Sequence, residues 1–453
     1  MLFAQVPFLF ARHPLAIKNS CERATLRCKM GLPVPNKCLV PRRQFIRLLG
    51  GVAMLNVNDI QETGPSARQA PGHYRRDGEV DWRLVRSDFL FAEGLVYLNC
   101  SAMGAVPNPV LSRTGQVWQT LEKDPSEQGY GALQQAMDDV RGQLARSIGC
   151  SQKELIATNS TTDGMNTVAQ GIGLSSGQRV LTTDQEHPGG RQCWDYFARR
   201  YGAVIDRISV PLQPQSAQEI LARFETRLTP ETRIISVSHI TFATGTPMPI
   251  RELSELAHAH GALCVVDGAQ AVGSQEVDVK ALACDAYCSC GHKWLLCPKG
   301  TGLLYISEKA RRVIDPLILQ DGERAYSHAT GVRNIPGILG LGASLDYLSA
   351  LGQQAITKHN LSLRNLAYAG LVKLPGIKIL SPPPGPYATP IVSLTLPEGI
   401  DNGAFVATLL RKHRIQVKVL PTDTYPRAIR ISPHIYNDED DINRFLVAVR
   451  KEL

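Results

Sequence analysis

Residues 263–270 read Leu-Cys-Val-Val-Asp-Gly-Ala-Gln, a short apolar run that ends in Asp267 and Gln270. Residues 286–294 read Ala-Tyr-Cys-Ser-Cys-Gly-His-Lys-Trp, a second such run that leads to His292 and Lys293. Both runs are typical of buried β-strands. In an open parallel sheet, ligands bind beyond the carboxyl ends of the strands, so these stretches predict both the sheet and its binding edge.

The same rhythm extends outward along the chain. The predicted strands are Leu155–Thr158, Arg179–Thr183, Val204–Ser209, Arg233–Ser238, Ala262–Asp267, Ala286–Cys290 and Gly302–Ile306. Helical patterns separate the first five, as in Ile250–His260, which Pro249 and Gly261 bracket. Alternation of strand and helix predicts an α/β domain, with a mainly parallel sheet covered by helices on both faces.

After Pro316 the pattern changes. A glycine-rich stretch from Gly331 to Gly342 predicts a linker, followed by a helix near Leu345 and a proline-rich turn at residues 381–386. Strands are predicted at Ile391–Leu396 and Ile415–Val419, and a C-terminal helix from about Asp438. The predicted organisation is a leader (1–72), an N-terminal segment (73–110), a large domain (111–325) and a small α+β domain (326–453).

The positive charge of the chain lies in its leader. Residues 1–50 hold nine basic residues and one acidic residue, which accounts for the whole net charge of +8. Residues 51–453 are therefore formally neutral, which argues against a nucleic-acid partner. Pro41-Arg-Arg-Gln-Phe-Ile-Arg47 precedes a short apolar run and resembles a twin-arginine export signal, so we expect a periplasmic or exported protein. The alternative is a basic tail on a cytoplasmic protein.

No run of the sequence is long and apolar enough to predict a membrane span. Eleven cysteines are present, three of them in the leader, and the other eight lie in apolar runs typical of buried free thiols. Cys284, Cys288, Cys290 and Cys297 cluster, but their spacing lacks the paired C-x₂-C of a structural zinc site. We therefore predict no metal site.

Polar residues follow five predicted strands. They are Asn159–Asp163, Asp184–His187, His239, Asp267–Gln270 and Gly291–Lys293. The segment Ser160-Thr161-Thr162 opens a helix, whose free N–H groups favour an anion such as phosphate, although the segment alone equally fits an ordinary N-cap. Buried Asp267 needs a cationic partner, which a protonated pyridine nitrogen or a structural arginine would supply, and an enclosed lysine suits Schiff-base chemistry. Phosphate, pyridinium and aldehyde together describe pyridoxal 5′-phosphate (PLP).

From about Tyr97 onward, the segments Val265–Val272 and Cys290–Tyr305 resemble the class V aminotransferases, which are fold-type I PLP enzymes. That family includes cysteine desulfurases and isopenicillin N epimerase-like proteins. The resemblance implies that Lys293 forms the Schiff base, that Asp267 pairs with the pyridine nitrogen and that His187 stacks on the ring. It further implies that Gln270 and His239 lie near the ring hydroxyl, that Thr161, Thr162 and His292 bind the phosphate, and that Arg430 binds the substrate carboxylate.

The sequence departs from the desulfurase pattern in three ways. Cys290 replaces a phosphate-binding serine, and Val332 replaces a threonine that reaches the neighbouring subunit's phosphate. No cysteine occurs between His413 and Ile429, where desulfurases place the thiol that accepts sulfur. The sequence therefore favours the isopenicillin N epimerase-like branch over a desulfurase.

The predicted function is PLP chemistry at the α-carbon of an amino-acid substrate, with Lys293 as the base, in an epimerase or C–S lyase. Cysteine desulfurase and aminotransferase are alternatives. A further alternative is a non-catalytic relative that keeps the fold as a binding protein. The family resemblance also implies a homodimer.

Overall fold

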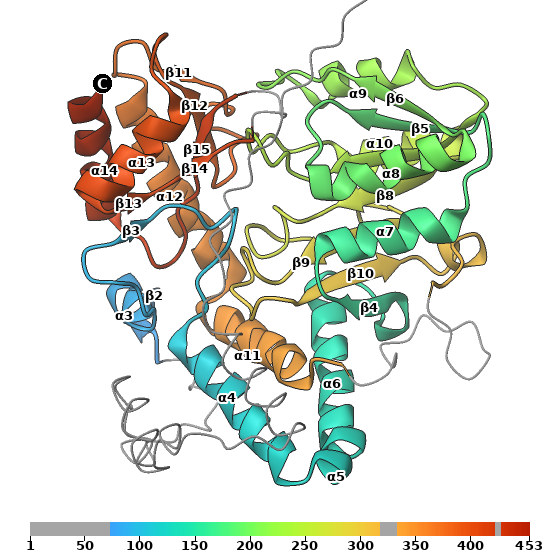
Figure 1. Cartoon of the computed structure of the whole chain (residues 1–453), viewed down its shortest axis with the longest axis horizontal. Helices are drawn as coiled ribbons and strands as arrows, with labels where there is room; N and C mark the ends of the chain where they lie inside the picture. Colours follow the sequence, from blue (N-terminus) through green and yellow to red (C-terminus); the bar gives the residue numbers. More distant parts are fainter. Residues whose placement is uncertain (1–72, 318–332, 422–426) are drawn as a thin grey trace, which may run out of the picture. The chain divides into compact units, whose positions relative to one another are not determined.

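The structure, a computed structural model, describes residues 73–317, 333–421 and 427–453. The predicted leader, the twin-arginine segment, the boundary between residues 325 and 326 and Val332 lie outside these residues. Two sheets of different size carry the described fold (Figure 1).

The larger sheet has seven strands in the order β4-β10-β9-β8-β7-β5-β6. Strand β10 is antiparallel to both of its neighbours, and all other pairs in the sheet are parallel. The strands are β4 (Leu155–Thr158), β5 (Arg179–Thr183), β6 (Val204–Ile208), β7 (Thr232–Ser238), β8 (Leu263–Asp267), β9 (Ala286–Cys290) and β10 (Gly302–Ile306). The seven predicted strands are confirmed to within one residue at each end.

Helices cover both faces of this sheet, as predicted (Figure 1). Alternate residues of β8 divide between two cores: Val265 packs with helices α7 (Thr161–Ile172) and α8 (Pro188–Tyr201). Val266 packs with the opposite layer, which includes α9 (Ala217–Glu225) and α10 (Ile250–Ala259). Burial on both faces explains why these strands are continuously apolar rather than alternating.

The N-terminal part of the described chain is mainly helical. It comprises β1 (Arg75–Arg76), β2 (Glu79–Val80), α3 (Trp82–Ser87), β3 (Val96–Tyr97), α4 (Asn108–Lys123), α5 (Pro125–Tyr130), α6 (Ala132–Ser147) and the 3₁₀ turn η2 (Gln152–Glu154). A further 3₁₀ turn, η3 (Ala310–Arg312), follows β10.

The smaller sheet is antiparallel, with the order β11-β12-β15-β14. Its strands are β11 (Lys378–Ile379), β12 (Val392–Thr395), β14 (Lys418–Val419) and β15 (Ile429–Ile431), and helices α12 (Gln353–Leu371), α13 (Asn402–His413) and α14 (Glu439–Glu452) accompany it. The predicted strand Ile415–Val419 is divided, because β13 (Ile415–Gln416) pairs instead with β3. Sequence reasoning missed α12, α13 and β15. The predicted C-terminal helix is confirmed, with Asp438 as its N-cap.

The predicted glycine-rich linker is wrong over residues 335–342, which belong to helix α11 (Ile335–Leu351). The glycines serve close packing: a Cβ on Gly340 would lie 2.4 Å from Thr114 Oγ1 of α4, and one on Gly342 would lie 2.4 Å from Val140 Cγ2 of α6. Tertiary packing therefore overrides the low helix propensity of glycine at these positions. The predicted helix near Leu345 is part of α11.

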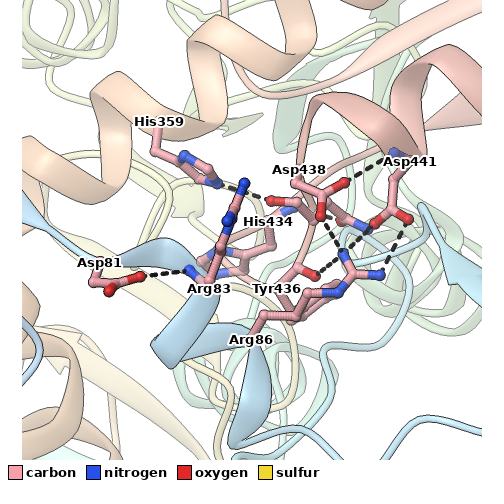
Figure 2. A network of polar contacts seen from close by, with 9 residues as sticks. Asp81, Arg83, Arg86, His359, His434, Tyr436, Asp438 and Asp441 are labelled. Atoms are coloured by element: carbon pink, nitrogen blue, oxygen red, sulfur yellow. Dashed lines mark hydrogen bonds and ion pairs between the residues drawn. The ribbon is translucent and has the colours of Figure 1, made fainter.

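A polar network ties α3 to the start of α14 (Figure 2). Arg86 donates to both carboxylate oxygens of buried Asp441, at 2.5 and 3.1 Å, and also to the carbonyl of Tyr436, at 2.8 Å. Nearby, buried His434 contacts the Trp294 carbonyl through Nε2, at 3.0 Å. The network thus joins the N-terminal segment, the C-terminal segment and the loop that carries Lys293.

No single helix among the described residues is long and apolar enough to cross a membrane, although α11 and α12, bent by 78° at their junction, meet the length and composition requirement as a pair. The eight cysteines in the described part of the chain are free thiols, and all but Cys150 are buried.

Candidate active site

A cavity of about 250 Å³ lies between the loops at the carboxyl ends of the larger sheet and strands β14 and β15 of the smaller sheet. Eight of the nine predicted site residues line it, and they come from parts of the sequence up to 269 positions apart. These residues are Thr161, Thr162, His187, Asp267, Gln270, His292, Lys293 and Arg430. The fold therefore brings the ends of β4, β5, β8 and β9 together, as the parallel sheet predicts.

Lys293 and Asp267 share this cavity without forming an ion pair with each other. Asp267 is 5% exposed, and its Oδ1 accepts a hydrogen bond from the Ala269 N–H at 2.9 Å. Burial raises the pKa of Asp267, and the charge of Lys293 opposes that shift. A cation held directly on the carboxylate would oppose this rise in the pKa further. The site therefore favours a ligand with a positively charged group at Asp267.

His187 is the N-cap of α8, and its ring contributes one wall of the cavity. Its Nδ1 accepts a hydrogen bond from the Gly189 N–H at 3.0 Å, so the neutral ring carries its proton on Nε2. Burial, with the charges of Lys293 and Arg430, lowers the pKa of His187 to about 4. A neutral imidazole packed edge-to-face on Phe242 (4.9 Å between centroids) suits an aromatic ligand.

Two glycines in the first turn of α8 keep the cavity open. A Cβ on Gly189 would lie 2.5 Å from Thr162 Oγ1, and a Cβ on Gly190 would lie 2.7 Å from Asp267 Oδ2. Both distances are shorter than packed side chains allow. Glycine at these positions lets the helix approach the carboxylate and the hydroxyl that line the cavity.

The start of α7 provides the anion-binding end. Ser160 is the N-cap, and its Oγ accepts from the Asp163 N–H at 3.1 Å, whereas the N–H groups of Thr161 and Thr162 have no acceptor within the helix. His292 lies beside them, with a pKa lowered to about 4 by burial and by the charge of Lys293. A helix N-terminus with adjacent hydroxyls fits a phosphate group.

Arg430 lies in β15 and is 3% exposed. One of its terminal nitrogens donates to the Phe242 carbonyl, and its Nε has no hydrogen-bond partner. Burial lowers its pKa to about 10, so it stays cationic at neutral pH, and no carboxylate of the described residues pairs with it. A buried, uncompensated guanidinium is suited to an anionic ligand.

The amide of Gln270 is anchored at both ends. Its Nε2 donates to the Ser101 carbonyl at 2.9 Å, and its Oε1 accepts from the indole N–H of Trp294 at 2.8 Å. The second amide hydrogen of Gln270 is therefore the group left for a ligand.

The structure does not bring His239 to the cavity. Its Nδ1 lies 2.9 Å from the Tyr287 hydroxyl and its Nε2 lies 3.3 Å from the amide of Gln275, while its backbone N–H donates to the Asp267 carbonyl at 2.8 Å. The ring is turned away because it completes a buried network behind Asp267. Its hydrogen bond to Asp267 is therefore made by the backbone and not by the ring.

Sequence reasoning missed several residues that line the cavity, namely Ser101, Ala102, Gly189, Phe242, Lys418, Leu420 and Pro421. Lys418 could have been found as the polar residue near the end of a predicted strand. Ser101 and Ala102 follow a two-residue strand that carries no strong periodic signal. Cys290 also lines the cavity, and burial raises the pKa of its thiol.

The residues present fit PLP. A carboxylate that needs a cation, a flat wall at His187, an anion-binding helix start and an enclosed lysine surround one cavity. These are the groups that recognise the pyridine nitrogen, the ring, the phosphate and the aldehyde.

Comparisons with known proteins agree with this fit. The family model described as Aminotransferase class-V matches residues 96–445. The chain is 28% identical to isopenicillin N epimerase of Amycolatopsis lactamdurans over 392 residues, covering 82% of this chain and 98% of that protein. It is 29% identical to a cysteine desulfurase of Escherichia coli O127:H6 over 394 residues, covering 79% and 93%.

The fold is also similar to that of a solved structure with PLP bound. A variant of the cystine C–S lyase C-DES, with glycine covalently linked to its PLP cofactor, superimposes with a TM-score of 0.72 at 24% identity. The match covers 81% of this chain and 98% of C-DES. At this identity the similarity shows the fold.

Proposed function

The chain belongs to the class V aminotransferase family of PLP-dependent enzymes, and we propose that it acts at the α-carbon of an amino acid as an epimerase or C–S lyase. The observation that carries this proposal is that Lys293, Asp267 and Arg430 line one cavity. An amine, a carboxylate and a buried guanidinium in that arrangement can hold the cofactor and the substrate carboxylate together.

PLP, when bound, supplies a ring that stabilises negative charge at the α-carbon of an attached amino acid. Asp267 would keep the ring nitrogen protonated, because a buried carboxylate and a cation stabilise each other. Gln270, fixed by Ser101 and Trp294, would donate its remaining N–H to the ring hydroxyl. His187 would cover one face of the ring and exclude water there.

Arg430 would orient the substrate by its α-carboxylate through charge-assisted hydrogen bonds. Lys293, once released from the cofactor, would remove the α-proton as a general base. In a lyase, Lys293 also returns a proton after the β-substituent leaves. In an epimerase, a proton would return to the opposite face of the α-carbon and the β-substituent would stay, so inversion of the amino acid against loss of its β-substituent separates the two reactions.

Cysteine desulfurase is supported less well. The cavity-lining thiol is that of Cys290, at the end of β9, and burial raises its pKa above the ordinary value. A thiol that accepts sulfur must be an accessible thiolate. The stretch between His413 and Ile429, where desulfurases place this thiol, holds no cysteine.

The proposal is tested with purified protein loaded with PLP. We expect visible absorbance from the lysine-bound cofactor, and after borohydride reduction the mass of the cofactor on the peptide that contains Lys293. A Lys293→Ala variant should lose both signals, and a variant of the exposed lysine Lys309→Ala should keep them. Cofactor retention without turnover of any amino acid would favour the non-catalytic alternative.

The reaction type follows from a substrate screen. D- and L-amino acids and cysteine conjugates are incubated in D₂O, and α-deuterium, optical inversion, pyruvate and sulfide are measured. Inversion with deuterium incorporation identifies an epimerase, and pyruvate with a released thiol or sulfide identifies a lyase. Formation of a 2-oxo acid with retained amino group on the enzyme would identify the aminotransferase alternative.

We further propose that the protein is a homodimer. Leu90 and Met103 of the N-terminal segment are 72% and 47% exposed, and Met103 adjoins Ala102 of the cavity. Exposed apolar side chains beside a site are typical of an interface. Sedimentation should give a dimer for the wild type and a smaller species for Met103→Glu; a monomeric wild type would contradict the proposal.

Export by the twin-arginine route is likewise proposed, on the sequence of residues 41–55 alone. Fractionation of cells that express the full chain should place the protein in the periplasm. Replacing Arg42 and Arg43 with lysine should retain it in the cytoplasm. A cytoplasmic wild type would favour the basic-tail alternative.

A further inference from the structure

Lys418 and Arg430 are direct cross-strand neighbours. Strands β14 and β15 pair antiparallel with Lys418 opposite Arg430 and Val419 opposite Ile429. Directly opposed residues place their side chains on the same face of the sheet, with Cβ atoms about 5 Å apart. Both side chains line the cavity. The sheet therefore presents two cations side by side to the substrate.

Neither cation has a carboxylate partner. No ion pair of the described residues includes Lys418 or Arg430, and Asp267 is the one acidic residue among those that line the cavity. Like charges directly opposed in a sheet destabilise it unless an anion lies between or beside them. Asp267 is the partner for the ring nitrogen under the proposed function, so it does not serve this purpose.

The α-carboxylate of a substrate can compensate the charge of Arg430 but not that of Lys418 as well. A substrate α-carboxylate on Arg430 forms two parallel hydrogen bonds with the fork, which leaves the ammonium of Lys418 free beside it. Lys418 is also half-buried, so it is less compensated by water than a surface lysine. Its neighbours in the cavity wall, Leu420 and Pro421, offer apolar contact to the methylene groups of a substrate side chain.

We infer that Lys418 and Arg430 form a two-cation site that selects an amino acid with a second carboxylate in its side chain. This inference rests on the proposed function, since it assigns the α-carboxylate to Arg430. Lys418 then determines specificity by binding the side-chain carboxylate. The substrate class is acidic amino acids and their derivatives, and neutral amino acids bind more weakly.

The test uses the PLP-loaded protein and unreactive ligands, so that binding is measured without turnover. Glutarate and butyrate, a dicarboxylate and a monocarboxylate, are titrated by their effect on the cofactor absorbance and by calorimetry. In the wild type we expect glutarate to bind about tenfold more tightly or better, the value of one charge-assisted hydrogen bond. In Lys418→Met that preference should vanish while butyrate binding changes by less than about twofold.

Two further variants serve as controls. Lys418→Arg keeps the charge and should retain the preference for glutarate. Lys378→Met removes an exposed lysine from β11 of the same sheet and should change neither ligand. If Lys418→Met weakens both ligands equally, Lys418 shares the α-carboxylate and the inference is overturned.

Equal affinity of the wild type for glutarate and butyrate also overturns it. Failure of the protein to bind PLP is a separate outcome, which contradicts the proposed function rather than the two-cation site alone. With active enzyme, KM for acidic amino acids should rise in Lys418→Met, and KM for their amides should stay within about twofold.

Discussion

The indole N–H of Trp294 donates a 2.8 Å hydrogen bond to Oε1 of Gln270, and Trp294 directly follows the proposed Schiff-base lysine. The carbonyl of Trp294 is in turn contacted by His434 Nε2 at 3.0 Å. One residue thus links Lys293, the amide that faces the cavity, and the C-terminal segment. The geometry assigns Trp294 a positioning role.

Replacing Trp294 with Phe should remove that hydrogen bond and leave Gln270 Oε1 buried without a donor. We expect a loss of about 1–3 kcal/mol in the free energy of unfolding and a shift in the absorbance of bound PLP, because Gln270 is free to turn away from the ring hydroxyl. Thermal unfolding and visible spectra measure the two effects.

Trp194→Phe is the matched control for this substitution. Trp194 is equally buried, and its indole N–H donates to Ser236 Oγ at 2.9 Å, but it does not line the cavity. It should lose comparable stability without changing the spectrum. An unchanged spectrum in Trp294→Phe as well would argue against a positioning role.

The contact between Gly190 and Asp267 gives a second prediction. A Cβ at residue 190 would lie 2.7 Å from Asp267 Oδ2, so Gly190→Ala must displace the carboxylate or the first turn of α8. We expect PLP affinity to fall about tenfold or more, because the displaced carboxylate of Asp267 no longer lies in position to bind the ring nitrogen. Titration of the apo protein with PLP measures the change.

Gly115→Ala provides the control for Gly190→Ala. Gly115 is an exposed residue of α4 with open space where a Cβ would lie. The substitution should stabilise the helix by about 0.5–1 kcal/mol and leave PLP affinity unchanged. Similar PLP affinity in Gly190→Ala and the wild type would show that the carboxylate does not require this clearance.

Residues such as Asp267 and Lys293 were predictable because Asp267 ends an apolar strand that is buried on both faces and Lys293 follows the end of another. Such strands carry a strong local signal, and the parallel topology then fixes which edge their ends share. His239 has the same position at the end of a strand, but the direction of its ring depends on Tyr287 and Gln275, which no local pattern indicates.

Helix α11 and Lys418 show what local patterns cannot supply. The glycines of α11 form a helix because Thr114 and Val140 leave no room for larger side chains, which is a property of the assembled core. Lys418 reaches the cavity because β14 pairs with β15 in a particular register. Strands of two or three residues have too little periodicity to reveal their partners in advance.

Glu186 gives a prediction about pH. Its carboxyl is buried and accepts hydrogen bonds from Ser238 Oγ at 2.6 Å and Thr183 Oγ1 at 2.7 Å. Burial raises its pKa from 4.5 to about 7 despite these donors. Between these pKa values the folded protein holds a proton that the unfolded chain has released, so the contribution of Glu186 to stability falls as pH rises through this window.

Glu186→Gln removes this titration and keeps the shape of the side chain. The free energy of unfolding of the variant relative to the wild type should therefore rise between pH 4.5 and 7, by an amount on the order of 3 kcal/mol at most. Buried imidazoles with a pKa of about 4, such as those of His239 and His434, impose the opposite slope on both proteins and cancel in the difference.

Denaturant unfolding across this pH range measures the difference, and exposed Glu225 at the end of α9 supplies the control. Glu225→Gln should track the wild type at every pH. A relative stability of Glu186→Gln that stays constant from pH 4.5 to 7 would contradict the raised pKa.

The ion pair between Arg86 and Asp441 gives the last prediction (Figure 2). Asp441 is 2% exposed and holds both terminal nitrogens of Arg86, while Asn437 also donates to it at 2.9 Å. Arg86→Gln would leave this carboxylate buried without its cation. Since Arg86 is about one-third exposed, we expect a loss of about 1–3 kcal/mol rather than the larger cost of a fully buried pair.

Arg83 tests whether the loss comes from the ion pair or from α3 itself. Arg83 is an exposed residue of the same helix, and it is held by Asp81 through its backbone N–H at 3.1 Å, which a side-chain substitution preserves. Arg83→Gln should therefore change the free energy of unfolding by less than about 0.5 kcal/mol. Equal destabilisation by the two variants would mean that α3 contributes through its helix propensity. A larger effect of Arg86→Gln, together with release of PLP at a lower denaturant concentration, would show that the ion pair between α3 and α14 also supports the cofactor site. The connection runs through His434, which belongs to the same network and contacts the residue that follows Lys293.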